Sequence, residues 1–205
     1  MAKAFKRIFI IFLENKSEQA VLDNAFMKSL ASRGVRLRKY FGVTHPSQPN
    51  YIAATAGLSF VVDDNRHDID ATNIVDLLEA KGVSWKAYME DLPETNKTIH
   101  ISKNRLYFRK HNPFVSFDNV RNSPSRLAKV VNAKRLQEDA KNNALPQYSW
   151  YTPNIQFRRA TNMKRVIILA DAISPSQKTL RWQLTAAAGS VFFTSNTPAR
   201  SHPFR

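Results

Sequence analysis

The sequence of 205 residues contains no cysteine. Disulfide bonds and thiolate metal sites are therefore excluded, and any bound metal ion must be held by oxygen and nitrogen atoms. The absence of cysteine does not identify a redox compartment, because many proteins of every compartment lack disulfides.

Long apolar runs are also missing, and no stretch approaches the roughly 20 residues that a membrane-spanning helix needs. The first residues imitate a secretory signal, with basic Lys3, Lys6 and Arg7 before an apolar run over residues 8–13. That run is too short for a signal peptide, and no small-residue cleavage site follows it. We therefore expect a core strand and no signal peptide, and the compartment stays open.

Acidic residues are scarce, with 16 Asp and Glu against 31 Lys and Arg, and the formal net charge is +15. The imbalance is greatest over residues 157–205, where Asp171 is the single acid among eight basic residues. Such a charge favours phosphorylated ligands or polyanions. Nucleic-acid binding is one alternative, but the basic residues are scattered and form no aromatic and basic recognition module.

The hydrophobic pattern predicts one α/β domain with a largely parallel central sheet and flanking helices. Apolar, β-branched runs typical of buried strands alternate with stripes of helical period. The predicted strands are residues 6–13, 35–43, 83–88 and 147–152, and the predicted helices are residues 17–32, 47–56, 72–80 and 124–140. A later segment, residues 166–173, fits either a strand or a short helix.

The chain divides into two parts by composition. We expect residues 1–156 to form the N-terminal portion of the domain, and residues 157–205 to be an atypical basic tail that is weakly ordered or foreign to the fold. Within the first part, Thr72 is the predicted N-cap of its helix. The irregular residues 91–117 are long enough to be a functional loop.

Two polar residues follow the first predicted strand. Glu14 and Asn15 supply a carboxylate and an amide oxygen, the hard ligands that divalent cations prefer. The carboxyl end of a strand is also where open α/β sheets bind their ligands. The alternative is a polar loop in which Asn15 caps the following helix.

A serine lies between two prolines at the predicted start of helix 47–56. Pro46 and Pro49 restrict the backbone around Ser47 and direct its hydroxyl to a helix N-terminus, which favours anions. A phosphoryl group fits such a position, and Asn50, one turn further on, could donate its amide to a phosphate oxygen. The alternative is a proline-rich turn with Ser47 as N-cap.

Histidines and a second carboxylate pair are further candidates. His111 follows Lys110, so a proton donor and a basic phosphate contact could lie together, although loop histidines are often only solvated. Residues 63–68 are acidic and fit either a cation site or a solvated loop. Glu90 and Asp91 follow a predicted strand, where surface carboxylates are the alternative.

Four motifs occur in order along the chain, at residues 14–17, 44–51, 72–91 and 110–114. Together they resemble the phosphoesterase family, which contains acid phosphatases and phosphatidylcholine-type phospholipases C. The resemblance covers about residues 7–156 and is nearer to the acid phosphatase branch. It implies the alkaline phosphatase superfamily, with an alkaline phosphatase-like sandwich as fold.

The resemblance also implies a reaction, in which a metal-assisted hydroxyl attacks a phosphomonoester and the phosphoenzyme is then hydrolysed. Ser47 would be the nucleophile, and Glu14, Asn15 and Ser47 would bind the divalent metal ion, whose identity stays open. Asn50 matches the asparagine of the Thr-Phe-Pro-Asn motif of nucleotide pyrophosphatase relatives and would bind phosphate. We assign His111 as acid catalyst, and His45 and Lys110 to binding the phosphorylated small-molecule substrate.

The sequence departs from the family pattern after Gln156. The family continues after residues 151–154 with an Asn-Asp-x-His-Asp segment and later a Thr-Trp-Asp-Glu strand end, and neither follows here. We therefore expect an incomplete metal site and a fold that is incomplete at its C-terminus. A catalytically impaired remnant is the alternative to an active hydrolase.

Overall fold

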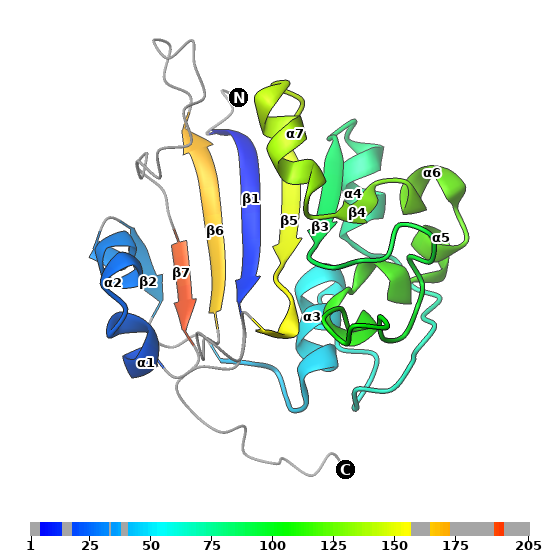
Figure 1. The fold of residues 1–205 in the computed structure, drawn as a ribbon, viewed down its shortest axis with the longest axis horizontal. Coiled ribbons are helices and arrows are strands. Elements are labelled where there is room, and N and C mark those ends of the chain that lie inside the picture. The colour runs from blue at the N-terminus through cyan, green and yellow to red at the C-terminus, as the bar shows by residue number, and fades with distance from the viewer. Residues whose placement is uncertain are drawn as a thin grey trace.

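The computed structural model describes residues 5–13, 18–32, 34–37, 41–156, 165–172 and 191–194. Four neighbouring parallel strands, ending at an edge strand, form one side of the sheet (Figure 1). Their spatial order is β1 (Phe5–Leu13), β5 (Tyr148–Thr152), β3 (Trp85–Met89) and β4 (Val130–Asn132). The predicted α/β class with parallel strands is confirmed.

Three further strands extend the sheet beyond β1. The strand β6 pairs antiparallel with β1 and with β7, and β7 pairs parallel with β2. These strands are β6 (Arg165–Ala172), β7 (Val191–Thr194) and β2 (Val35–Leu37). The segment that fitted a strand or a short helix is therefore a strand.

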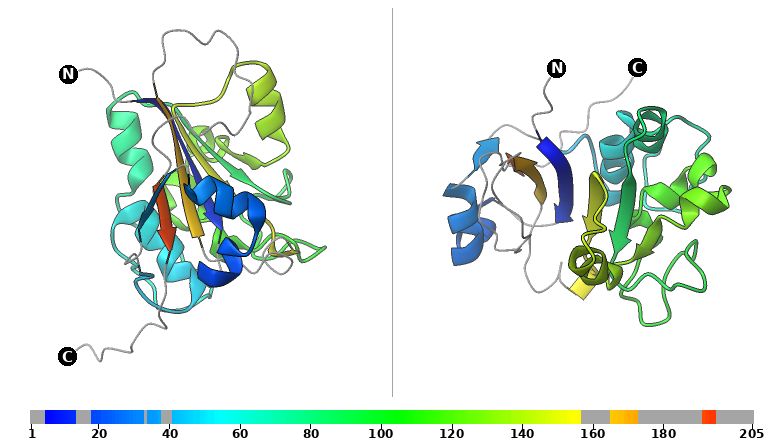
Figure 2. Two further views of the ribbon diagram at one scale, coloured as in Figure 1. Left: turned by 90° about the vertical axis from the view of Figure 1, so that its left-hand side faces the viewer. Right: turned by 90° about the horizontal axis from the view of Figure 1, so that it is seen from above.

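Helices cover both faces of the sheet and give three layers (Figure 2). On one face lie α3 (Ser47–Ala56) and α4 (Ile74–Ala80); on the other lie α1 (Glu18–Leu22), α2 (Ala25–Ser32) and α7 (Arg135–Lys141). The short elements near β4 and α3 are η1 (Arg109–His111), η2 (Phe114–Ser116), α5 (Asp118–Arg121) and α6 (Pro124–Leu127). Within the described ranges, no helix is long and apolar enough to cross a bilayer.

Alternate residues of β3 separate the core into two sides, because successive side chains of a strand point to opposite faces. Trp85, Ala87 and Met89 belong to the cluster beneath α3 and α4. Tyr88 packs instead with Val131 under α7. Burial on both faces explains why the parallel strands read as nearly continuous apolar runs.

Several elements match their predicted ranges closely. The strands β1, β3 and β5 are confirmed to within two residues at each end, and α3 begins and ends where the sequence indicates. Gly57 ends α3 in the left-handed conformation, with φ of 79°, which glycine adopts without steric cost. These elements carry strong local signals that the tertiary structure leaves unchanged.

Two predictions near the N-terminus are wrong in part. The helix predicted over residues 17–32 is divided into α1 and α2, because Asn24 accepts a hydrogen bond from the Met27 backbone N–H at 3.1 Å and starts a new helix. The strand predicted over residues 35–43 is shorter, since β2 ends at Leu37 and residues 41–46 lie in no strand.

The helix predicted over residues 124–140 is also wrong. The chain there forms α6, the strand β4 and then α7. Val130 and Val131 are buried, and their backbone pairs with Ala87 and Tyr88 of β3. Two adjacent β-branched residues favour a strand once a neighbouring strand is available, which local periodicity does not reveal.

Thr72 is not the cap of α4, contrary to the sequence prediction. Asn73 occupies the N-cap, where its Oδ1 accepts from the Val75 N–H at 2.9 Å, and Asp76 completes a capping box. Asn73 also donates to Asn119 Oδ1 at 2.9 Å and is 3% exposed. The buried asparagine therefore links α4 to α5, whereas Thr72 is exposed.

Replacing Asn73 with alanine should lower the free energy of unfolding by about 1–2 kcal/mol, because a helix cap and a buried hydrogen bond are lost. Urea unfolding followed by circular dichroism measures the change. Thr72→Ala is the matched control and should stay within about 0.5 kcal/mol of the parent. Equal effects at the two positions would contradict the assignment of the cap.

Candidate active site

The candidate site lies at the carboxyl edge of the parallel strands. In Figure 1 the arrowheads of β1 and β5 reach the lower edge of the sheet, and α3 lies beside that edge. The tight packing of α3 against the 3-10 helix η1 brings two of the motif segments together. Ligands of open α/β sheets bind at this kind of edge.

Ser47 is the first residue of α3, and Pro46 occupies the N-cap without a capping side chain. The predicted alternative, in which Ser47 itself is the N-cap, is therefore wrong. The side chain of Ser47 is half-buried, and its hydroxyl makes no hydrogen bond with any residue in the described part of the chain.

Asn50 holds the loop that precedes α3. Its Oδ1 accepts from the Val43 N–H at 2.8 Å, and its Nδ2 donates to the carbonyl oxygens of Thr44 at 2.8 Å and Pro46 at 2.9 Å. A Cβ added to Gly42 would lie 2.9 Å from Asn50 Oδ1, so glycine permits this close approach. Phosphate binding by Asn50 stays a prediction, and it requires one of these hydrogen bonds to be exchanged.

Asp64, within the acidic residues 63–68, makes two contacts that sequence reasoning missed. Its Oδ1 accepts from the Gln48 backbone N–H at 2.9 Å, and its Oδ2 accepts from Lys110 Nζ at 2.5 Å. The partners lie 16 and 46 residues away in the sequence, so no local spacing reveals them. Lys110, predicted to bind substrate, is therefore near Ser47 but paired with a carboxylate.

The other acidic residues of this stretch are paired as well. Asp68 lies 2.6 Å from Arg109, whose side chain is 1% exposed, and 3.2 Å from Arg121. Asp63 lies 2.5 Å from His67. Among the described residues, no group of three or more His, Asp or Glu side chains is arranged to hold a metal ion. Each of the three carboxylates in this stretch thus has a basic partner.

His111 is buried, with 4% of its surface exposed. Its ring centroid lies 5.3 Å from that of Tyr51, one turn after Ser47, and 6.1 Å from that of Phe108. Burial and, after it, the positive charge of Lys110 lower the pKa of His111 to about 3. The imidazole therefore stays neutral well below pH 6.5, where a solvated histidine becomes protonated.

A small pocket opens beside His111, where β3 and β5 end. It is lined by Met89, Glu90, Leu106, Tyr107, Phe108, His111, Thr152 and Pro153. Glu90 accepts hydrogen bonds from the Tyr151 hydroxyl and, at 2.7 Å, from the Asn154 backbone N–H. The pocket therefore places one carboxylate near a neutral histidine.

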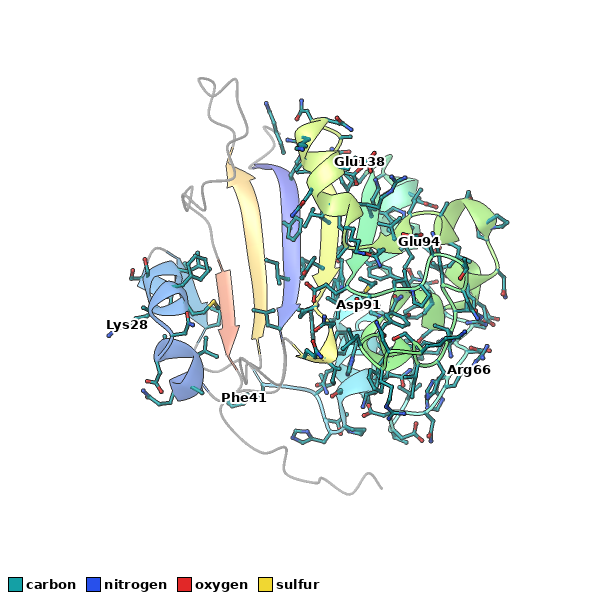
Figure 3. All side chains as sticks on the ribbon, viewed as in Figure 1. Lys28, Phe41, Arg66, Asp91, Glu94 and Glu138 are labelled. Carbon is teal, nitrogen blue, oxygen red and sulfur yellow. The ribbon has the colours of Figure 1, made fainter. Side chains whose placement is uncertain are left out.

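Glu90 and Asp91 are half-buried and hydrogen-bonded, so they differ from ordinary surface carboxylates. Asp91 Oδ2 accepts from Asn154 Nδ2 at 2.7 Å. In Figure 3 Asp91 lies beside the lower part of the sheet, whereas Arg66 lies at the outer margin. These contacts tie the end of β3 to the end of β5.

Of the remaining predicted site residues, the structure describes His45 but not Glu14 or Asn15. His45 is exposed in the loop before α3, and its peptide bond to Pro46 is cis. Glu14 and Asn15 lie outside the described residues, so their distance from Ser47 and their role as metal ligands stay predictions. The structure brings together Ser47, Lys110 and His111.

The chain is similar in sequence to several known proteins. A family model described as the phosphoesterase family matches residues 12–167, which extends past Gln156. A probable acid phosphatase from Kluyveromyces lactis is 42% identical over 160 residues, which cover 74% of this chain and 38% of that protein. An acid phosphatase from Aspergillus fumigatus is 37% identical over 163 residues, covering 74% of this chain and 36% of that protein.

A bacterial relative is more distant in sequence. A phosphatidylinositol-3-phosphatase from Mycobacterium tuberculosis is 32% identical over 156 residues, which cover 73% of this chain and 50% of that protein. The matched part of the chain thus spans between 36% and 50% of the length of these three curated relatives.

His111 should make the fold sensitive to acid. The unfolded histidine binds a proton below about pH 6.5, whereas the folded one stays neutral down to about 3, so the stabilisation is complete above 6.5 and is lost as the pH falls towards 3. We expect the contribution of His111 to lower the free energy of unfolding by about 2 kcal/mol when the pH falls from 7 to 5.

Urea unfolding at several pH values measures that slope in the parent and in His111→Gln. The slope should flatten in His111→Gln, whatever its absolute stability, and should persist in the control His45→Gln, which changes an exposed histidine. A slope that is unchanged in His111→Gln would show that other groups cause the acid sensitivity.

Proposed function

The chain belongs to the phosphoesterase family, and from this premise we propose that it hydrolyses phosphate monoesters through attack by the Ser47 hydroxyl. The observation that carries the proposal is the placement of Ser47 as the first residue of α3, with a hydroxyl that makes no structural hydrogen bond among the described residues. A nucleophile must be reachable and uncommitted in this way.

The helix end supports attack on phosphorus. The dipole of α3 favours an anion beside Ser47 at the helix N-terminus, where the Gln48 N–H is already bonded to Asp64. In the proposed reaction, Ser47 Oγ forms a bond to phosphorus, and the bond from phosphorus to the ester oxygen breaks. Water then cleaves the serine phosphate, which releases inorganic phosphate and restores the hydroxyl.

A divalent metal ion is part of the proposal, with Glu14, Asn15 and Ser47 as its protein ligands. Their carboxylate, amide and hydroxyl oxygens have the hard character that such cations prefer. When bound, the ion would lower the pKa of the serine hydroxyl and neutralise charge on the phosphate. With one carboxylate, this ligand set has fewer charges than tight hard-ion sites usually have, so we propose that the site is incomplete.

We propose that His111 donates a proton to the leaving alcohol. It lines the small pocket beside Glu90, at the carboxyl ends of β3 and β5. The negative charge of a bound phosphate would raise the pKa of His111 from its low value in the free protein, and so allow the protonated form. Lys110, Asn50 and His45 remain the proposed substrate-binding residues.

The arrangement of layers supports the proposal of an alkaline phosphatase-like fold. Helices on both faces of a parallel four-stranded core are compatible with an alkaline phosphatase-like sandwich (Figure 2). The three relatives are all named as phosphatases, enzymes that remove phosphate from an ester, which supports a phosphomonoester as the substrate class.

Ser47→Ala should lower kcat for a phosphomonoester such as p-nitrophenyl phosphate on the order of 10³-fold or more, because the nucleophile is lost. Steady-state hydrolysis by purified protein measures the change. Ser125→Ala removes an exposed serine of α6 and serves as the control with unchanged activity. Hydrolysis that survives intact in Ser47→Ala would refute the assignment.

Metal binding can be measured without activity. Titration of the parent protein with Mg²⁺, Mn²⁺ or Ca²⁺ in a calorimeter should show one site, and Glu14→Gln should weaken its affinity at least ~10-fold, because a charged ligand is removed. Glu94→Gln changes an exposed carboxylate and is the matched control. Tight binding at one equivalent would argue against a catalytically impaired remnant, and identical affinities in Glu14→Gln and the parent would refute the metal site.

A further inference from the structure

We propose that Asp64 is a positioning residue for the reaction of Ser47, an inference that rests on the proposed function. Its two carboxylate oxygens bind two different elements, at the Gln48 N–H of α3 and at the ammonium group of Lys110. Among the described residues, no other carboxylate forms a hydrogen bond or an ion pair with the N-terminal turn of α3. Asp64 thereby joins the nucleophile's helix to the segment that carries His111.

The first contact replaces a missing cap. An α-helix begins with backbone N–H groups that have no partner within the helix, and Pro46 at the N-cap has no side chain that could accept from them. Asp64 accepts from Gln48, the second residue of α3, at 2.9 Å. A negative charge at this end also interacts favourably with the helix dipole. The carboxylate thus holds the backbone immediately after Ser47.

The second contact orients the opposite side of the site. Lys110 lies in η1 directly before His111, and its Nζ is 2.5 Å from Asp64 Oδ2. The two side chains are only about a quarter exposed, at 26% and 27%, so solvent screens the ion pair less than it screens a fully exposed pair. The contact between the rings of Tyr51 and His111 continues the same interface.

This geometry predicts a particular kinetic effect. Without Asp64, the start of α3 and the Lys110 side chain can move independently, so Ser47 is less often aligned for attack and kcat falls. Lys110, released from its carboxylate, becomes more available to the substrate phosphate, so KM should not rise. A residue that acted only on global stability would not separate kcat from KM in this way.

The test compares Asp64→Ala, Asp64→Asn and the control Asp63→Ala in the full chain. We expect kcat for p-nitrophenyl phosphate to fall at least ~10-fold in Asp64→Ala, with KM unchanged or lower. Asp64→Asn should be intermediate, because its amide oxygen can still accept from Gln48 but its charge is lost. Asp63→Ala should stay within about two-fold of the parent, since Asp63 contacts only His67 and Asn65 among the described residues.

Hydrogen exchange supplies a readout that does not depend on activity. The Gln48 amide should exchange at least ~10-fold faster in Asp64→Ala than in Asp63→Ala, because its charged acceptor is removed. Unchanged kcat in Asp64→Ala, or unchanged Gln48 exchange, overturns the positioning role while Ser47→Ala remains inactive and the proposed function stands. Activity that survives in Ser47→Ala overturns the function and the positioning role together.

Discussion

The aromatic contact between α3 and the sheet determines where the candidate site lies. Tyr51 of α3 packs against Phe12 of β1 with ring centroids 4.2 Å apart, and Phe12 stacks on Trp150 of β5 at 5.2 Å. Tyr51 and Trp150 are fully or almost fully buried. Because Ser47 precedes Tyr51 by one helical turn, this packing also sets the position of the hydroxyl at the carboxyl edge of the strands.

Ion pairs connect the outer elements to this core and change how the net charge should be interpreted. Glu79 of α4 accepts from Lys129, Trp85 and Arg126 at 2.6 to 2.9 Å. Partial burial alone would raise the pKa of Glu79, but these three hydrogen bonds lower it to about 2. Part of the basic excess thus serves to anchor helices, so the charge of +15 by itself does not indicate a nucleic-acid surface.

The accuracy of the sequence predictions follows the range of the interactions. Local signals located α3, since prolines mark its start and Gly57 its end, and apolar runs located β1, β3 and β5. The same reasoning missed β4, because its strand conformation depends on pairing with β3. The sequence predicts Thr72 as a cap, but the adjacent Asn73 is also a good capping residue, and its burial against α5 makes it the cap.

The sequence by itself determined the chemical groups of the candidate site: a hydroxyl between prolines, a lysine next to a histidine, and a carboxylate and an amide after the first strand. The family was recognisable for the same reason, since its motifs are short and contiguous. Only the tertiary structure decided that His111 is buried and neutral, and that Asp64 joins Gln48 to Lys110. Burial and contacts across 16 to 46 residues arise from packing, which no local pattern of residues records.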